Sequence, residues 1–252
     1  MPKYCVILPA AGSSSRFGGK THLKKPFVSL KNQPVWLYSA QKFRERSDVA
    51  QIIVVISEED EEFFKVKFSS NLAVMDISLV IGGKERTDSV RNALGKVSDE
   101  CDFVAVHDAA RPCLQTEWID DVFEQAEKSG AAILASPIVG TIKKVDSNKR
   151  ISQTVSRDGL WQAQTPQVFE KQLLLNAYKI YSGPATDDSQ VVESSGHPVD
   201  IVYCPNTNIK ITTQSDLRLA ENILRSAPKK DALSEFSQRP NRNTPSLDDL
   251  FG

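Results

Sequence analysis

Basic side chains follow a run of small residues near the N-terminus. Residues 9–17 read PAAGSSSRF, and Arg16 is followed by Lys20, Lys24 and Lys25. Small residues let successive backbone N–H groups approach an anion and surround it, and the planar guanidinium of Arg16 suits phosphate oxygens. The segment is therefore a candidate polyphosphate loop, although a plain surface loop with incidental lysines accounts for it equally well.

Two common phosphate-binding motifs match this loop only in part. The dinucleotide fingerprint G-x-G-x-x-G has only Gly12 in place. The P-loop pattern G-x-x-x-x-G-K-[ST] is met by residues 14–21, SSRFGGKT, except that Ser14 replaces the first glycine. Asp108, at the end of a strand-like run, would then be the magnesium carboxylate. A P-loop nucleoside triphosphatase or kinase is therefore one alternative.

Composition narrows the classes of protein to which this 252-residue chain can belong. The net charge of -1 gives no overall field that attracts nucleic acid or an anionic membrane. No apolar run reaches the ~18 residues of a membrane span, and the start of the chain does not read as a signal peptide. The four cysteines show neither CxxC nor zinc spacing. We expect a cytoplasmic protein that binds neither nucleic acid nor membranes.

Alternating strand-like and helix-like segments predict the scaffold that positions the candidate loop. Apolar runs typical of buried strands lie at residues 4–9, 51–56, 78–81, 102–107, 131–136 and 199–203. Helical spacing of apolar residues lies at 35–46, 88–96, 117–129, 168–181, 187–195 and 213–226. This order predicts an α/β fold with a mainly parallel, twisted sheet and helices on both faces. Ligands of such sheets bind beyond the carboxyl ends of the strands.

Residues 138–156 interrupt this alternation. Two β-rich segments, 141–145 and 151–155, flank a polar turn, which predicts a protruding hairpin arm. An isolated two-stranded hairpin is marginally stable, so a partner subunit is a natural surface for it to pack on. We therefore predict one domain at residues 1–226, from which the arm protrudes. Residues 227–252, polar and poor in apolar side chains, are predicted to be a disordered tail.

Several blocks, taken in order, resemble the 2-C-methyl-D-erythritol 4-phosphate cytidylyltransferases, the IspD family of isoprenoid precursor synthesis. They are PAAG at 9–12 with Arg16, KPF at 25–27, GGKERTDSV at 82–90, VHDAARP at 106–112, TIK at 141–143, Arg157 with GLW at 159–161, QTPQ at 164–167, TD at 186–187 and NIK at 208–210. The resemblance covers about residues 4–225. The chain departs from the family where Ser14 replaces a second glycine and Lys24 replaces a proline, and its segment from Arg16 to Lys25 is slightly longer. These departures leave open which of Lys24 and Lys25 is the functional lysine.

The resemblance implies a Rossmann-like nucleotidyltransferase that joins CTP to 2-C-methyl-D-erythritol 4-phosphate and releases pyrophosphate. It makes Arg16, Lys25 and Lys210 the catalytic residues. It places CTP against Pro9, Ala10, Ala11, Gly12, Gly82, Gly83, Ser89, Asp108 and Ala109. It assigns Arg111, Thr141, Arg157, Thr165 and Thr186 to the polyol phosphate, the last three acting from the neighbouring subunit of a homodimer. A cytidylyltransferase for another polyol phosphate, such as ribitol 5-phosphate, shares most of these motifs and is a second alternative.

The chemistry of these residue types suits phosphoryl transfer. A phosphate monoester is an anion near neutral pH, because its second pKa is about 6, so its attack needs no general base. Mg²⁺ combines one or two carboxylates with substrate phosphates, and Asp108 is the expected ligand of Mg²⁺ or of another divalent cation. Plain structural roles remain open for some of the residues. Gly82 and Gly83 suit an ordinary turn, and Ser89 can hydrogen-bond to the backbone of its own helix.

Overall fold

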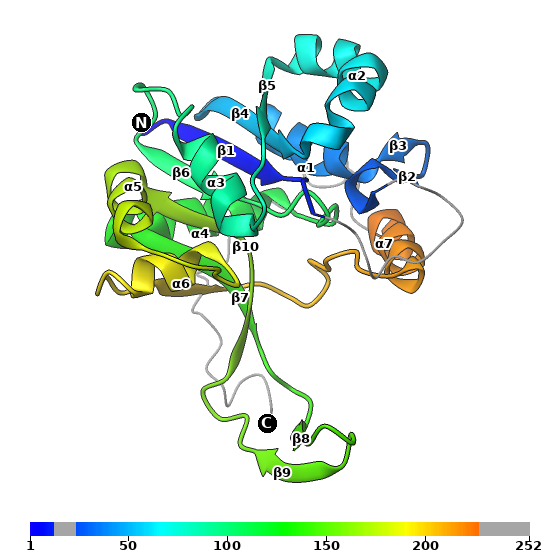
Figure 1. Ribbon diagram of the computed structural model, residues 1–252, viewed down its shortest axis with the longest axis vertical. Coiled ribbons are helices and arrows are strands. Elements are labelled where there is room, and N and C mark those ends of the chain that lie inside the picture. The colour runs from blue at the N-terminus through cyan, green and yellow to red at the C-terminus, as the bar shows by residue number, and fades with distance from the viewer. Residues whose placement is uncertain (13–23, 227–252) are drawn as a thin grey trace, which may run out of the picture.

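A seven-stranded sheet, in the order β11-β7-β10-β6-β1-β4-β5, forms the centre of the protein (Figure 1). The computed structural model describes residues 1–12 and 24–226. The strands are β1 (Tyr4–Pro9), β4 (Val49–Ile56), β5 (Ile77–Ile81), β6 (Phe103–Val106), β7 (Ala131–Pro137), β10 (Trp161–Glu170) and β11 (Asp200–Tyr203). β1 runs parallel to β4 and β6, β4 parallel to β5, and β7 parallel to β11. The predicted mainly parallel sheet is confirmed.

Helices cover both faces of this sheet. They are α1 (Val35–Arg44), α2 (Glu61–Met75), α3 (Arg86–Leu94), α4 (Thr116–Ser129), α5 (Lys171–Ile180), α6 (Asp188–Glu193) and α7 (Gln214–Ser226). Val6 and Leu8 of β1 share one apolar cluster with α1, α2 and α4. Cys5 and Ile7, which alternate with them and point to the opposite face, share a second cluster with α3, α5 and α6. The strand is thus buried on both faces, as its continuous apolar run predicts.

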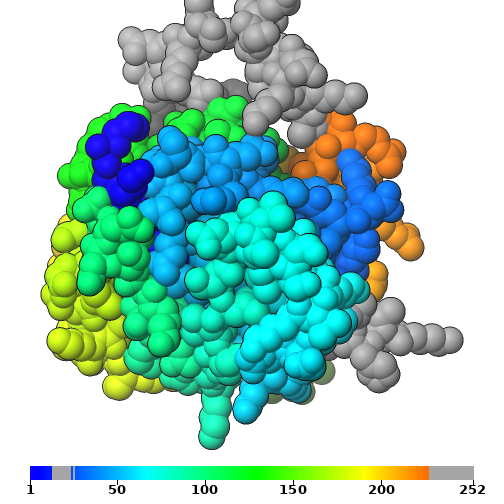
Figure 2. Space-filling model, turned by 90° about the horizontal axis from the view of Figure 1, so that it is seen from above, coloured from blue at the N-terminus to red at the C-terminus, as the bar shows by residue number. Residues whose placement is uncertain are grey.

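A third, smaller apolar cluster attaches the last helix. Leu30 and Val35 pack with Ile211 and Ala220. Leu30 belongs to the short β2 (Ser29–Leu30), which pairs with β3 (Gln33–Pro34). In the space-filling view, α7, in orange, lies beside the blue segment that contains this small hairpin (Figure 2). The cluster brings the chain just before α7 close to the N-terminal third of the protein.

The main departure from the sequence-based prediction concerns residues 161–170. We expected a helix to begin at residue 168, but β10 continues to Glu170 and α5 begins at Lys171. β10 pairs antiparallel with β6 on one side and β7 on the other. Val168 and Phe169 are fully buried in this position. Partners on both sides therefore override the local helical pattern. α2 was also not predicted.

The predicted hairpin arm is confirmed in outline. β8 (Ile142–Val145) pairs antiparallel with β9 (Ile151–Val155), and the pair extends away from the sheet (Figure 1). The backbone N–H of Ile138 donates to the carbonyl of Leu160 at 3.0 Å, so the arm reaches beyond the predicted end at residue 156. Val145 and Ile151 are 51% and 66% exposed at the tip.

All four cysteines are buried and none forms a disulfide. Within the described part of the chain, every helix is too short or too polar to span a bilayer. The thiols serve as small apolar side chains of the core.

Candidate active site

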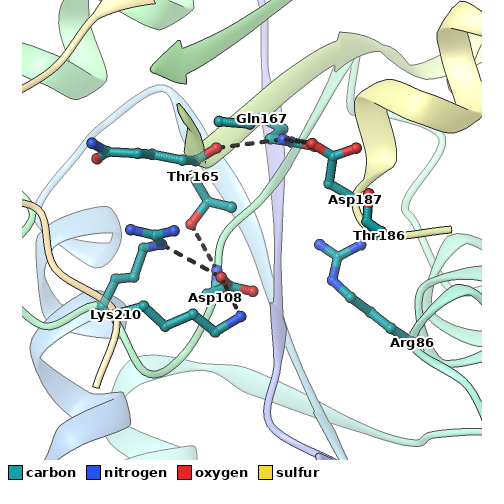
Figure 3. A pocket seen from close by; sticks show the side chains of 10 residues that line it. Arg86, Asp108, Thr165, Gln167, Thr186, Asp187 and Lys210 are labelled. Carbon is teal, nitrogen blue, oxygen red and sulfur yellow. Dashed lines mark hydrogen bonds and ion pairs between the residues drawn. The ribbon is translucent and has the colours of Figure 1, made fainter. Parts of the chain in front are cut away.

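A cavity of about 240 Å³ opens where several segments meet beyond the end of β6. Its walls come from the start of α3, the loop after β6, the middle of β10, the start of α6 and the segment before α7. Ligands of a parallel sheet bind at this end of the strands. Figure 3 shows Asp108 and Lys210 on one side of the cavity, with Arg86 facing them from the other. Polar and charged side chains make up nearly all of the lining.

Asp108 is the most deeply buried carboxylate of this lining, being 8% exposed. Its Oδ2 atom lies 2.8 Å from Lys210 Nζ and 3.4 Å from Arg111 Nε. Burial alone would raise the pKa of the Asp108 carboxyl, but the charges of Lys210, Arg86 and Arg111 hold that pKa well below its usual range. Asp108 therefore stays ionised at neutral pH, and it orients two of the cations.

His107, the residue before Asp108, determines whether the hydroxyl of Thr165 donates or accepts a hydrogen bond. Burial lowers the pKa of His107 to about 4, so the ring is neutral at pH 7. Its Nε2 atom lies 3.2 Å from Ser39 Oγ and 3.3 Å from the carbonyl of Arg111. The Ser39 hydroxyl donates to that same carbonyl at 3.1 Å, so both neighbours of Nε2 act as acceptors and Nε2 carries the proton. Nδ1 is then the acceptor, and the Thr165 hydroxyl, 3.1 Å away, donates to it. The histidine thus fixes the direction of the threonine hydroxyl.

The remaining hydrogen-bonding capacity of Thr165 follows from this direction. Its oxygen also accepts the backbone N–H of Asp108 at 3.0 Å. A hydroxyl has one donor and two lone pairs, so one lone pair of Thr165 is left for a ligand. Thr165 can therefore accept a hydrogen bond from a polyol hydroxyl, but in this arrangement it does not donate to a phosphate oxygen. This differs from the expectation that Thr165 binds the substrate phosphate.

Thr165 and Thr186 also differ from the expectation that they serve a neighbouring subunit. Both line the same cavity as Asp108, Arg111 and Lys210 of their own chain. Thr165 belongs to β10, whose central place in the sheet brings it against the loop after β6. Thr186 is held just before α6, where its hydroxyl donates to Gln190 Oε1 at 3.1 Å. Both threonines are therefore placed to act on a ligand of their own chain.

Thr141 and Arg157 lie elsewhere. Both are exposed on the arm, and neither is among the residues that line the cavity. Arg157 donates from Nη1 to the carbonyl of Val139, across the base of the arm. The expectation that Thr141 shares a pocket with Arg111 and Lys210 is therefore not met within one chain.

The loop after β1 meets the turn after β5, as a shared nucleotide site requires. A Cβ atom added at Gly82 would lie 2.9 Å from the Cβ of Ala11 and 2.7 Å from Ser89 Oγ. One added at Gly83 would lie 2.3 Å from the Cβ of Asp88. All three distances are shorter than side-chain packing allows, so the two positions need glycine. The close approach places both segments against the same space.

Ser89 makes the contact to its own helix that the sequence left open. Its hydroxyl donates to the carbonyl of Glu85 at 3.1 Å and accepts the N–H of Gly83 at 3.1 Å. One lone pair remains, which suits a donor such as the exocyclic amine of cytosine. Ser89 therefore holds the glycine turn and can offer only an acceptor to a base.

The other residues predicted to bind the nucleotide are placed as follows. Pro9 ends β1, and the N–H of Ala10 donates to the carbonyl of Val55 at 2.7 Å. Among the described residues, a Cβ added at Gly12 would meet no atom within 4 Å. Ala109 is fully buried and can contribute only backbone atoms.

The two loop lysines are distinguished by their contacts. Lys24 Nζ lies 2.5 Å from Glu59 Oε1, 2.7 Å from Asp60 Oδ2 and 2.7 Å from Ser57 Oγ. These two carboxylates neutralise its charge, so Lys24 ties the loop to the turn after β4. Lys25 starts a short 3₁₀ helix (Lys25–Phe27), and its side chain lies outside what the structure describes. Arg16 and the predicted tail, residues 227–252, also lie outside the described residues.

The structure gives a place in the site to four residues that stand in the family blocks but were assigned no ligand contact from the sequence. Arg86, Gln167 and Asp187 line the cavity, and His107 orients Thr165 from behind. Arg86 lies in the same segment as the glycine pair, and Asp187 directly follows Thr186. Their proximity in the sequence to predicted site residues was therefore the signal that could have found them. The sequence does not show in which direction each side chain points.

Comparison with known proteins adds independent information. The family model described as IspD, 2-C-methyl-D-erythritol 4-phosphate cytidylyltransferase, matches residues 4–226. A curated relative from Rhodopirellula baltica that bears this enzyme's name is 41% identical over 87% of this chain and 93% of its own length. One from Clostridioides difficile with the same name is 38% identical over 88% of this chain and 93% of its own. The crystal structure of the enzyme so named from Thermus thermophilus superimposes with a TM-score of 0.73 at 29% identity, covering 89% of this chain and 100% of the other. The Francisella tularensis structure of that name superimposes with a TM-score of 0.71 at 30% identity, covering 88% of this chain and 99% of the other.

Proposed function

Because this chain belongs to the 2-C-methyl-D-erythritol 4-phosphate cytidylyltransferase family, we propose that its cavity aligns the phosphate of that polyol with the α-phosphorus of CTP. The chain is a nucleotidyltransferase that forms CDP-methylerythritol. The observation that carries the proposed site is the convergence of Lys210 and Arg111 on Asp108, in a cavity whose wall includes the start of α3. The same helix carries Ser89, which holds the glycine turn against Ala11.

The reaction needs alignment and charge neutralisation more than proton transfer. An oxygen of the polyol phosphate attacks the α-phosphorus of CTP, and the bond from that phosphorus to the bridging oxygen of the β-phosphate breaks. Pyrophosphate leaves with the bonding pair, and the attacking oxygen has no proton to lose. Lys210 and Arg111 neutralise the phosphate charge that approaches, while Asp108 keeps both cations in place. Arg16 and Lys25 are proposed to bind the triphosphate.

The donor set also fits a magnesium ion. Mg²⁺ takes one or two carboxylates and completes its shell with water and substrate phosphates. Asp108 is ionised and accepts the contacts from Lys210 and Arg111 through Oδ2. Its Oδ1 atom has no hydrogen bond among the described residues. Asp108 would hold the ion, which would neutralise charge on the triphosphate.

We further propose that two arms complete each other's sites in a homodimer. The exposed apolar tip of the arm supports an interface with a second copy. Thr141 and Arg157 would then reach the cavity of the partner, since they do not line their own. Arg157 would bind the polyol phosphate there.

The assay combines the protein with Mg²⁺, CTP and 2-C-methyl-D-erythritol 4-phosphate, and measures pyrophosphate and CDP-methylerythritol. Ribitol 5-phosphate runs in parallel as the rival acceptor, and better turnover of it would overturn the acceptor assignment. Lys210→Ala should abolish most turnover. Lys128→Ala, which removes an exposed lysine on α4, is the matched control and should not.

Mixed dimers test the shared site. Arg157→Ala and Lys210→Ala chains should each be nearly inactive alone. A mixed dimer would retain one intact site, built from the Lys210 of one chain and the Arg157 of the other. Random mixing should therefore restore about a quarter of wild-type activity. Absence of recovery after verified exchange of subunits would refute sites shared across chains.

A further inference from the structure

Arg86 has one guanidinium nitrogen that the fold leaves without a partner. The residue is the first of α3, three positions after Gly83, and it lines the cavity. Its Nη2 donates to Asp188 Oδ2 at 2.5 Å. Its Nη1 is buried and has no hydrogen bond among the described residues. Buried polar groups are normally satisfied, so an orphaned cationic N–H in a cavity wall points to an acceptor on a ligand.

The guanidinium is held rigidly by what lies behind it. Asp188 is fully buried and accepts a second hydrogen bond from the hydroxyl of Tyr178 at 2.6 Å. The backbone N–H of Asp188 donates to Gln167 Oε1 at 2.9 Å, which joins the start of α6 to β10. Asp188 is therefore fixed on several sides, and it anchors one arm of the Arg86 guanidinium through a charge-assisted hydrogen bond. A preorganised donor loses little conformational freedom when a ligand binds.

The charges around the cavity favour an anion. Three lining residues are cationic, namely Arg86, Arg111 and Lys210, against the carboxylates of Asp108 and Asp187. Asp187 is already engaged as the N-cap of α6, where it accepts the N–H of Gln190 at 3.1 Å and Gln167 Nε2 at 2.9 Å. Figure 3 shows Arg86 across the cavity from Asp108 and Lys210, beside Thr186. An anion between them would meet cations on two sides.

We propose that Arg86 is a further substrate-binding residue, whose Nη1 donates to a phosphate oxygen of the phosphorylated acceptor while Asp188 fixes the other arm of the fork. This rests on the proposed function of the cavity. The acceptor is the substrate concerned because Arg111, Thr165 and Thr186, three contacts expected for the polyol phosphate, share the lining with Arg86, whereas, among the described residues, Asp108 is the one contact expected for CTP that lines it. A structural arginine, which only links α3 to α6 through Asp188, is the competing explanation.

The conservative variant Arg86→Lys separates these two roles. A lysine can keep the ion pair with Asp188 but has no second arm to offer the ligand. We expect KM for 2-C-methyl-D-erythritol 4-phosphate to rise by about tenfold or more, with KM for CTP unchanged within about twofold. Arg46→Lys is the matched control, since Arg46 pairs with Asp48 and Asp120 outside the cavity. It should leave both KM values as they are.

Binding of inorganic phosphate tests the same contact without turnover. Calorimetry should show weaker phosphate binding to Arg86→Lys than to the wild type and to Arg46→Lys. This holds even if the wild type fails to use CTP and the polyol phosphate, so failure of the proposed function and failure of the Arg86 contact are distinguishable. Unchanged phosphate affinity and unchanged KM in Arg86→Lys would leave only the structural role. A rise confined to the KM for CTP would also overturn the proposal.

Discussion

Thr165→Val removes one hydroxyl and leaves two buried groups without a partner. The backbone N–H of Asp108 loses its acceptor at 3.0 Å, and His107 Nδ1 loses its donor at 3.1 Å. Valine keeps the branched shape, so the substitution creates little empty space. The effect therefore reports the hydrogen bonds rather than packing.

The magnitude follows from the number of groups left unsatisfied. Each buried group without a partner destabilises the fold by roughly 1–3 kcal/mol, so the free energy of unfolding should fall by roughly 2–6 kcal/mol. For a chain of this size, 1 kcal/mol corresponds to about 2–4 °C in Tm, so Tm should fall by at least about 4 °C. Loss of the bond to the Asp108 backbone also loosens the carboxylate that orients Lys210. A displacement of ~1 Å at such a site lowers turnover by roughly 100-fold, and we expect kcat/KM to fall by roughly 10- to 100-fold.

Thermal unfolding and pyrophosphate release measure the two effects. Thr165→Ser is the control, because it keeps the hydroxyl and removes only one methyl group, worth about 1 kcal/mol. It should stay close to the wild type in both measurements. The reasoning fails if the valine variant matches the wild type, or if the serine variant is as impaired as the valine variant.

Three further predictions concern neighbouring residues. The pKa of His107 lies at about 4 in the folded chain against 6.5 for the free side chain, so between these values only the unfolded state binds the proton. The free energy of unfolding should therefore fall by about 3 kcal/mol as pH drops from 6.5 to 4, a slope that chemical denaturation should find reduced in His107→Gln. Gly83→Ala should raise KM for CTP by about tenfold or more, because its methyl group would meet Asp88, whereas Gly95→Ala should not, since its Cβ would lie 3.5 Å from its nearest neighbour. Lys25→Met should abolish most turnover, whereas Lys24→Met should chiefly lower Tm, because Lys24 is paired with Glu59 and Asp60. If Lys24→Met instead lost more turnover than Lys25→Met, Lys24 would be the functional lysine.

The sequence predicted a structural element correctly where the residues of that element alone form a clear pattern. The apolar run of β1 predicts a strand buried on both faces, and all but the last of its residues are buried. The polar turn between two β-rich segments predicts the arm. Asp108 could be placed at the end of a strand, hence at the ligand-binding end of the sheet, without any knowledge of its neighbours. The family blocks predicted the reaction, because their occurrence in the same order along the chain is specific to one enzyme family.

The direction and use of each side chain depended instead on partners far away in the sequence. Residues 161–170 became a strand because β6 and β7 flank them, although their continuation reads as helix. The hydroxyl of Thr165 points as it does because the carbonyl of Arg111 forces the proton of His107 onto Nε2. Lys24 is neutralised by Glu59 and Asp60, and Arg86 is half satisfied by Asp188, 102 positions further along the chain. Residue types and their order thus determined the scaffold and the kinds of side chain present in the site. Tertiary contacts decided which donors and acceptors remain for a ligand, because a group that is hydrogen-bonded inside the protein is no longer available to a substrate.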